Sequence, residues 1–160
     1  MAGTLKVKIE EDIILDNQDY GSKRTLEIGS IASIVKRIVN IGTNEIGLLG
    51  FGTAYNTELS KSYLAGQFDE DNVRYIRITN LDGTNHIALV LKNENNDEFG
   101  VKVDKGCSFL YCADLAGGVV DTMDSADAAG ITPNSFGDLV DITCAADTAA
   151  CDVEVFVAST

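Results

Sequence analysis

Four alternating segments between Asn72 and Cys112 constrain the fold of this chain more than any other feature. They are VRYIRITNL, HIALVLKN, DEFGVKVD and CSFLYC, in which apolar and polar residues alternate with the period of two that a half-buried strand requires. The segments are separated by Leu81–Asn85, Glu94–Asn96 and Asp104–Gly106, which are rich in turn-forming residues. The pattern predicts a β-meander, which specifies a fold without specifying a reaction.

The rest of the chain adds further strands and no long helix. Strands are expected at Leu5–Leu15, Thr25–Ile28, Ile31–Ile41, Glu45–Phe51 and Asp152–Ala158, with a polar loop at Asn17–Arg24. The segment Ile31–Ile41 also fits helical spacing, but its many β-branched residues favour a strand. One short helical turn is expected at Ser135–Val140. Eight to ten strands predict an all-β chain, a single β-sandwich domain of jelly-roll type over residues 1–160.

A long polar segment, Gly52–Asn72, interrupts this series of strands. Its length exceeds the usual connection of about 4 to 6 residues, which predicts a functional loop or an arm that reaches a neighbouring subunit. Five large apolar side chains are spaced through it and need a surface to cover. They are the candidate interface residues Tyr55, Leu59, Tyr63, Leu64 and Phe68. We expect them to contribute to a homo-oligomeric contact, such as a ring or a trimer.

The charge of the chain argues against two classes of partner. Twelve Lys and Arg against 25 Asp and Glu give a net charge of −13, and such a surface repels nucleic acid and anionic lipid. No window reaches the roughly 20 apolar residues that span a bilayer, and the first residues do not resemble a secretory signal. We therefore expect no nucleic-acid or membrane partner, and synthesis in the cytosol unless the chain was supplied already processed.

The four cysteines lack the spacing of a zinc ribbon or of a thioredoxin-like site. Cys107 and Cys112 are five positions apart, so within one strand their side chains point to opposite faces. Cys144 and Cys151 flank a six-residue segment and are a candidate disulfide if that segment forms a hairpin. Reduced, buried thiols are the default expectation.

The sequence contains little that could carry catalysis. Nucleophilic catalysis of the Ser-His or Cys-His kind needs an imidazole, and the chain has one histidine, His86, directly after a turn. Three acidic clusters, Asp69–Asp71, Asp97–Glu98 and Asp121–Asp127, are interpreted as solvated loops because none matches a calcium-binding loop. No glycine-rich nucleotide loop is present either. We expect no catalytic residue, no metal site and no cofactor.

Part of the chain resembles a known group of proteins. The run from Asp71 to Tyr111, the segment GVVDTMD and the ending CDVEVFVAST resemble small structural proteins of tailed bacteriophages, especially those of marine hosts. The matching motifs are the strand Val73–Leu81 and the hairpin Glu98–Phe109, and the likeness covers roughly 90 residues. The resemblance implies a β-sandwich or jelly-roll protein of the virion that carries no catalytic residues.

These observations lead to a functional expectation with one alternative. The resemblance implies a capsid decoration (cement) protein, a head fibre or a tail-associated component that is made in the host cytoplasm and resides in the virion. Its partners would be further copies of itself and the major capsid protein or other virion proteins. The alternative is a lectin-like carbohydrate-binding module that uses loop tyrosines, although the chain has no Trp to supply the strongest stacking platform.

Overall fold

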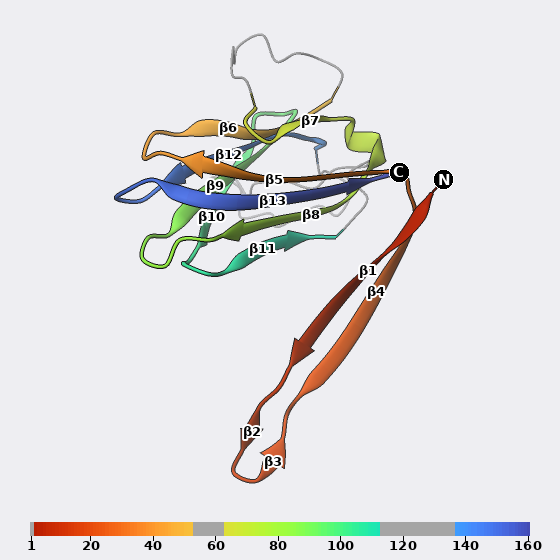
Figure 1. The fold of residues 1–160 in the computed structure, drawn as a ribbon. Helices are drawn as coiled ribbons and strands as arrows, with labels where there is room; N and C mark the ends of the chain where they lie inside the picture. The colour runs from red at the N-terminus through yellow and green to blue at the C-terminus, as the bar shows by residue number, and fades with distance from the viewer. Residues whose placement is uncertain (1, 53–62, 113–136) are drawn as a thin grey trace, which may run out of the picture.

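The described part of the chain is all β. The computed structural model describes residues 2–52, 63–112 and 137–160. Within these ranges there are thirteen strands and one 3-10 turn, and no α-helix (Figure 1). The all-β expectation is therefore confirmed for the described residues.

Two sheets form the body of the molecule. The five-stranded sheet has the order β10-β9-β12-β6-β7, and all its neighbours are antiparallel except β6 and β7. Its strands are β6 (Ile46–Phe51), β7 (Gly66–Phe68), β9 (Ile87–Asn93), β10 (Glu98–Val103) and β12 (Leu139–Ala146). The four-stranded sheet has the antiparallel order β11-β8-β13-β5. Its strands are β5 (Ser33–Ile41), β8 (Val73–Asn80), β11 (Ser108–Tyr111) and β13 (Cys151–Ser159).

One hydrophobic core lies between these two layers. The alternating residues of β13 place Val153, Val155 and Val157 inside, and the same period in β9 places Leu89 inside. Strand β6 differs because it is buried on both faces from Gly47 onward, as its continuous apolar sequence indicates. Its pairing with β12 contains a β-bulge, because Ile142 pairs with Leu49 whereas the next residue, Thr143, pairs with Gly47. The interior is thus built from Ile, Val and Leu of both sheets.

The four segments predicted as a meander are all strands, but they do not form a meander. Strands β8 and β11 lie in one sheet, whereas β9 and β10 lie in the other. The connections at Leu81–Asn85 and Asp104–Gly106 therefore cross between layers (Figure 1). The expectation was wrong because alternation indicates which face of a strand is buried and does not indicate which strand lies beside it.

A buried asparagine fixes the first of these crossings. Asn80 ends β8, and its side-chain amide donates to the carbonyl of Asn85 at 2.9 Å and to that of Val103 at 3.3 Å. Its side-chain oxygen accepts from the Asp82 N–H at 3.0 Å. The Asp82 carboxylate in turn accepts from the backbone N–H groups of Asn85 and Thr84, and these bonds hold its pKa below the ordinary value. The turn residues were identified correctly, and their hydrogen bonds direct the chain into the second layer.

The N-terminal part of the chain forms a long hairpin arm that projects from the body (Figure 1). The arm pairs β1 (Gly3–Glu11) with β4 (Ser22–Ile31), and the short strands β2 (Ile14–Leu15) and β3 (Gln18–Asp19) form its tip. The polar loop expected at Asn17–Arg24 is therefore wrong, because these residues lie in the tip and in the start of β4. Asp16 and Asn17 have positive φ values of 50° and 63°, as a two-residue type I′ turn requires.

Two further expectations concern the long segment after Gly52 and the helical turn at Ser135–Val140. The long segment after Gly52 contains β7 and a 3-10 turn at Glu70–Asn72, which Asp69 caps. The helical turn expected at Ser135–Val140 is not present in its described part, where β12 begins at Leu139. Leu139 instead pairs with Asn93 of β9, so sheet formation overrides the local capping pattern. Residues 135 and 136 lie outside the described ranges.

The candidate disulfide pair occupies two buried positions. Cys144 lies in β12 and Cys151 begins β13, and these strands belong to different sheets, so the intervening segment is not a hairpin within one sheet. Both residues are free thiols, as are Cys107 and Cys112, which are exposed. Burial, followed by the nearby Cys151 thiol, raises the pKa of Cys144 to about 12. The Cys144 thiol is therefore inert in the folded state.

A thiol-modifying reagent should accordingly distinguish two classes of cysteine. At neutral pH we expect rapid modification of Cys107, slower modification of Cys112, whose pKa is raised by partial burial, and modification of Cys144 and Cys151 only after unfolding. Mass spectrometry of the labelled peptides measures how far each cysteine is modified. Recovery of only Cys107 and Cys112 from protein that is denatured without a reductant would show that Cys144 and Cys151 are bonded to each other.

Candidate interaction surfaces

The end of the long polar segment lies against the edge of the five-stranded sheet. Leu64 donates its N–H to the Gly47 carbonyl at 3.1 Å, and Ala65 donates to Leu48 at 2.9 Å. The half-buried Tyr63 ring lies directly over Gly50, because a Cβ built on this glycine would be 2.3 Å from the ring. Gly50 is therefore needed for close approach, and the ring covers the backbone of β6.

The candidate interface residues do not share one environment. Phe68 is half-buried and packs against Phe51 with 6.3 Å between ring centroids. Leu64 is 39% exposed, whereas Tyr63 is half-buried. Tyr55 and Leu59 lie outside the described residues. Tyr63 and Phe68 thus pack on the chain's own sheet, and Leu64 is the described member that is open to a partner.

The outer face of the four-stranded sheet carries a network of charged side chains. Glu154 of β13 binds the ammonium of Lys36 at 3.0 Å, and its other oxygen binds the guanidinium of Arg77. The Arg77 guanidinium also lies 5.9 Å from the centre of the Phe156 ring. The hydrogen bond from Lys36, with a smaller contribution from Arg77, holds the pKa of Glu154 below its ordinary value of 4.5. The network joins β5, β13 and β8 across the face.

The base of the arm packs beside this network. Tyr75 and Phe156 meet edge to face at 5.8 Å, and they form a small cluster with Ile31 and Ala158. Leu5, Val7 and Ile28 of the arm are packed against this cluster and are partly buried. The outer sheet face therefore holds the base of the arm in place.

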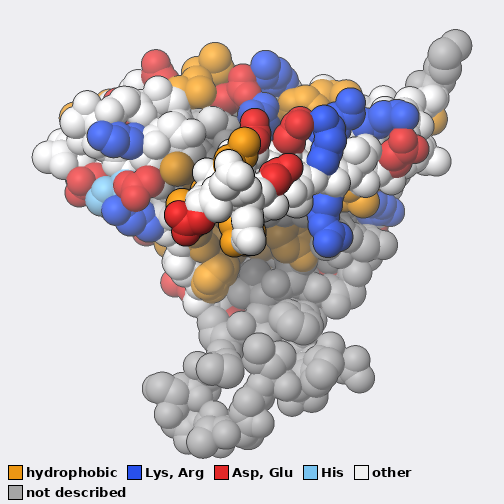
Figure 2. Space-filling model, turned by 90° about the horizontal axis from the view of Figure 1, so that it is seen from below, with side chains coloured by type: hydrophobic (Ala, Val, Ile, Leu, Met, Phe, Trp, Pro, Cys, Tyr) orange, Lys and Arg blue, Asp and Glu red, His pale blue; other side chains and the backbone are white. Residues whose placement is uncertain are grey.

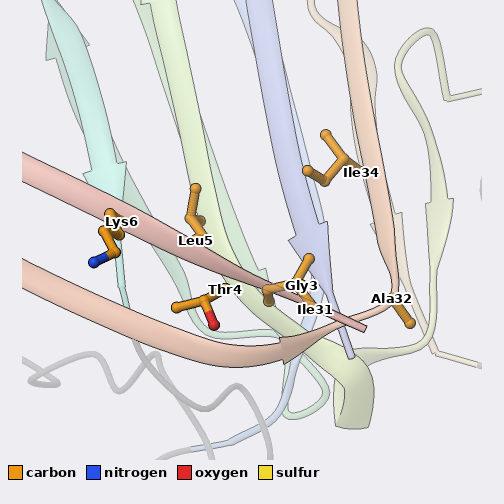
Figure 3. Close-up of a pocket in the computed structure, with 7 residues that line it drawn as sticks. All are labelled: Gly3, Thr4, Leu5, Lys6, Ile31, Ala32 and Ile34. Atoms are coloured by element: carbon orange, nitrogen blue, oxygen red, sulfur yellow. The ribbon is translucent and has the colours of Figure 1, made fainter. Parts of the chain in front are cut away.

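A cavity of about 370 Å³ lies between the arm and β5. Leu5 of β1 and Ile34 of β5 stand on either side of β13, with Ile31 between them (Figure 3). The complete lining consists of Gly3, Thr4, Leu5, Lys6, Ile31, Ala32 and Ile34. Ile34 is 56% exposed, so an apolar wall of this cavity faces solvent. The cavity can accept an apolar side chain from a partner.

The tip of the arm presents hydrophobic side chains that were not among the candidate interface residues. Among them, Ile14 is 72% exposed. The others are Ile13, Leu15 and Tyr20, each more than half exposed. Figure 2 looks towards the tip and shows hydrophobic and acidic side chains together over it, with Lys and Arg side chains to one side. The Asp16-Asn17 pair, which directly follows the apolar run Ile13–Leu15, is the turn signal from which the hairpin could have been predicted.

The residues weighed for catalysis and metal binding are engaged in local contacts. His86 Nδ1 lies 3.4 Å from an Asp147 oxygen, and both side chains are partly exposed. Asp69 caps the 3-10 turn, and Glu98 lies 3.5 Å from the Lys92 ammonium. Among the described residues no three His, Cys, Asp or Glu side chains are grouped so as to hold a metal. Asp121–Asp127 lies outside the described residues.

The charged network yields a prediction about acid stability. Replacing Glu154 with Gln should lower the melting temperature by a few degrees near neutral pH, because the ion pairs with Lys36 and Arg77 are lost. A carboxylate with a depressed pKa stabilises the fold above its unfolded pKa, and this contribution disappears as the pH falls through the folded pKa. The difference between variant and wild type should therefore shrink below about pH 4. Calorimetry across this pH range measures it.

Glu27→Gln is the matched control for this experiment. Glu27 pairs with Lys6 at 2.7 Å, but both side chains are 57% exposed, whereas the Glu154 side chain is 14% exposed. Solvent screening should make the control effect smaller. Equal effects of the two substitutions, or an effect of Glu154→Gln that is independent of pH, would contradict the assignment.

The contact between Tyr63 and Gly50 yields a second prediction. Gly50→Ala should displace the ring and destabilise the protein by about 1–3 kcal/mol, as overpacking does. Burial, with the Asp141 carboxylate as a smaller cause, raises the pKa of Tyr63 above 10.0, so its displacement should bring that pKa back towards 10.0. Nuclear magnetic resonance of labelled tyrosine follows the titration, and Tyr63→Phe assigns the signal. Gly100→Ala, whose added Cβ would be 4.0 Å from the nearest carbonyl, should change neither quantity.

No protein-family model matches the chain, and no curated protein matches it. The described residues contain no helix that is long and apolar enough to cross a membrane.

Proposed function

We propose that the two sheets form a jelly-roll β-sandwich. The support is the nesting of strand pairs: β5 pairs with β13, β6 with β12, β8 with β11, and β9 with β10. This is the order produced when one long antiparallel hairpin is rolled so that successive pairs fall in alternate sheets. The remaining contacts, β13 with β8 and β12 with β9, are those that the rolled hairpin makes with itself. Strand β7 is an addition at the edge next to β6.

We propose further that the chain is a non-enzymatic structural protein of a tailed-bacteriophage virion. In this function it decorates the capsid as a cement protein, or forms a head or tail appendage, as a homo-oligomer. The observation that carries the proposal is the projecting arm, whose tip exposes Ile14 and its neighbours to solvent. An exposed apolar extension on a compact β body suits a protein that joins other subunits. The likeness of Val73–Leu81 and Glu98–Phe109 to virion proteins directs the proposal to the virion.

The proposed partners are further copies of this chain and the major capsid protein or other virion proteins. The net charge of −13 disfavours nucleic acid and anionic membranes as partners. The alternative of a carbohydrate-binding module has less support in the described part of the chain, because Tyr63 packs on the chain's own sheet and Tyr20 is the remaining described loop tyrosine with an exposed ring. The non-enzymatic part of the proposal rests on the scarcity of histidine, because the sequence has only one.

The test of this function is the composition of the source particle. Antibodies against the folded chain should label purified phage particles at regular positions in electron micrographs, and mass spectrometry should find the chain in multiple copies per particle. Added protein should also bind particles from which the chain has been deleted. Absence of the chain from purified particles that are otherwise complete would overturn the proposal.

A further inference from the structure

The arm contacts the body through one small apolar surface. The arm contributes Leu5, Val7 and Ile28 to this contact. The part of the body that receives them, which we call the base surface, consists of Ile31, Tyr75, Phe156 and Ala158. In the described part of the chain the ion pairs of the arm join β1 to β4 and do not reach the body. The arm of a second copy can make the same apolar contacts, because the base surface is identical in every copy.

A hinge of two residues joins the arm to the body. The pairing of β1 with β4 contains a β-bulge, in which Gly29 and Ser30 together lie opposite Thr4. Beyond the bulge the Ala32 N–H donates to the Ser159 carbonyl at 2.9 Å, which fixes the chain on the body side. The bulge is therefore the place at which the arm turns away from the body.

The hinge holds Ser30 in an unfavourable backbone conformation. Its φ of 61° lies in the left-handed region, which disfavours side chains other than glycine. The other non-glycine residues with positive φ in the described ranges are Asp16, Asn17 and Asn96, whose residue types tolerate this region better. Ser30 is exposed, and within the described ranges its side chain makes no hydrogen bond that offsets this cost. Short connections under strain favour the exchange of a segment between copies.

An extended hinge relieves this strain and lengthens a strand. β4 ends at Ile31 and β5 begins at Ser33, so an extended Ser30 makes residues 22–41 nearly one continuous strand. The arm then points away from its own base surface. It can reach the base surface of a second copy when the two hinges lie side by side at a two-fold axis, because the three steps from Ile28 to Ile31 span at most about 11 Å.

The position of the hinge allows a second copy to approach this closely. β5 is an edge strand of the four-stranded sheet, and the arm leaves the body where β5 begins and β13 ends (Figure 1). The cavity of about 370 Å³ at this point is lined by Ile31, Ala32 and Ile34 as well as by the start of β1. Ile34 is 56% exposed, so the closed hinge leaves apolar surface uncovered. The hinge of a second copy can lie against this surface.

We propose that two copies of this chain exchange their arms, so that the arm of each packs on the base surface of the other. The contacts of Leu5, Val7 and Ile28 are retained but join different chains, and Ser30 becomes extended in both copies. The exposed Ile34 side chains of the two copies lie beside the axis. The exchange does not depend on the virion assignment, and its failure would leave the test on phage particles unaffected.

The first experiment changes the backbone preference of the hinge and measures self-association of the full chain by analytical ultracentrifugation. We expect a dimer of the wild type. Ser30→Gly removes the penalty of the closed hinge and should raise the dissociation constant at least about tenfold, because each dimer contains two hinges. Ser30→Val makes the closed hinge less favourable and suits an extended one, so the constant should fall at least about tenfold.

Asn96 supplies the matched control for these substitutions. Its φ is 67°, but it lies in the turn between β9 and β10 and not in the hinge. Asn96→Gly and Asn96→Val should each change the dissociation constant by less than about twofold. The valine variant should nevertheless lower the melting temperature, because its side chain disfavours positive φ.

The second experiment shows which copy provides each arm. A cavity of about 380 Å³ between the arm and the end of β11 is lined by Leu26 and by the exposed Cys112. In the variant Cys107→Ser, Leu26→Cys, a short bifunctional maleimide should join positions 26 and 112. Exchange places these two thiols on different chains, so denaturing electrophoresis should show linked dimers. With Ser30→Gly added, most chains should be linked to themselves.

The two experiments decide the proposal together. Linked dimers, with opposite shifts of the dissociation constant in the two Ser30 variants, support the exchange. A wild type that remains monomeric at millimolar concentration, or a dimer whose chains are linked only internally, overturns it. Shifts of the constant in the same direction for Ser30→Gly and Ser30→Val also overturn it. The linking experiment keeps the wild-type hinge, so it gives a result even if Ser30→Val does not fold.

Discussion

The pairing of the last strand with two earlier strands is the constraint on which the rest of the structure depends. β13 lies between β5 and β8, with Ser159 paired to Ser33 on one side and to Val73 on the other. Its inward valines fill the core. On its outer face Glu154 binds Lys36, and Phe156 belongs to the cluster that packs against the base of the arm. Because these contacts join residues far apart in sequence, folding requires the closure of long loops.

The arm is positioned by this same strand but is not stabilised along its length. Ala32 donates its N–H to the Ser159 carbonyl at 2.9 Å, which joins the end of the arm to the end of β13. The cluster around Tyr75 then holds Leu5 and Val7, whereas Ile14 has no comparable surface. The body therefore has its own hydrophobic core, and the arm is an extension that the body holds at its base.

The strands of the body could be predicted from the sequence better than the arm could. The strands at Val73–Asn80, Ile87–Asn93 and Ser33–Ile41 follow from their alternation or their β-branched content. The arm was missed because the polar residues after Asn17 were interpreted as a loop, although they pair with residues of comparable polarity in β1, such as Lys23 with Glu10. A strand that is solvated on one face and does not pack on the core with its other face shows only a weak alternation of apolar and polar residues.

The sequence alone determined many of the strands of the body, which of their faces are apolar and where several turns interrupt them. Those properties follow from side-chain spacing and from the backbone preferences of single residues. The tertiary structure decided that β8 and β9 lie in different layers, that Tyr63 covers Gly50, and that the N-terminal hairpin projects from the body as an arm. Backbone hydrogen-bonding groups are the same in every strand, so the choice of neighbour depends on burying all the apolar faces at once.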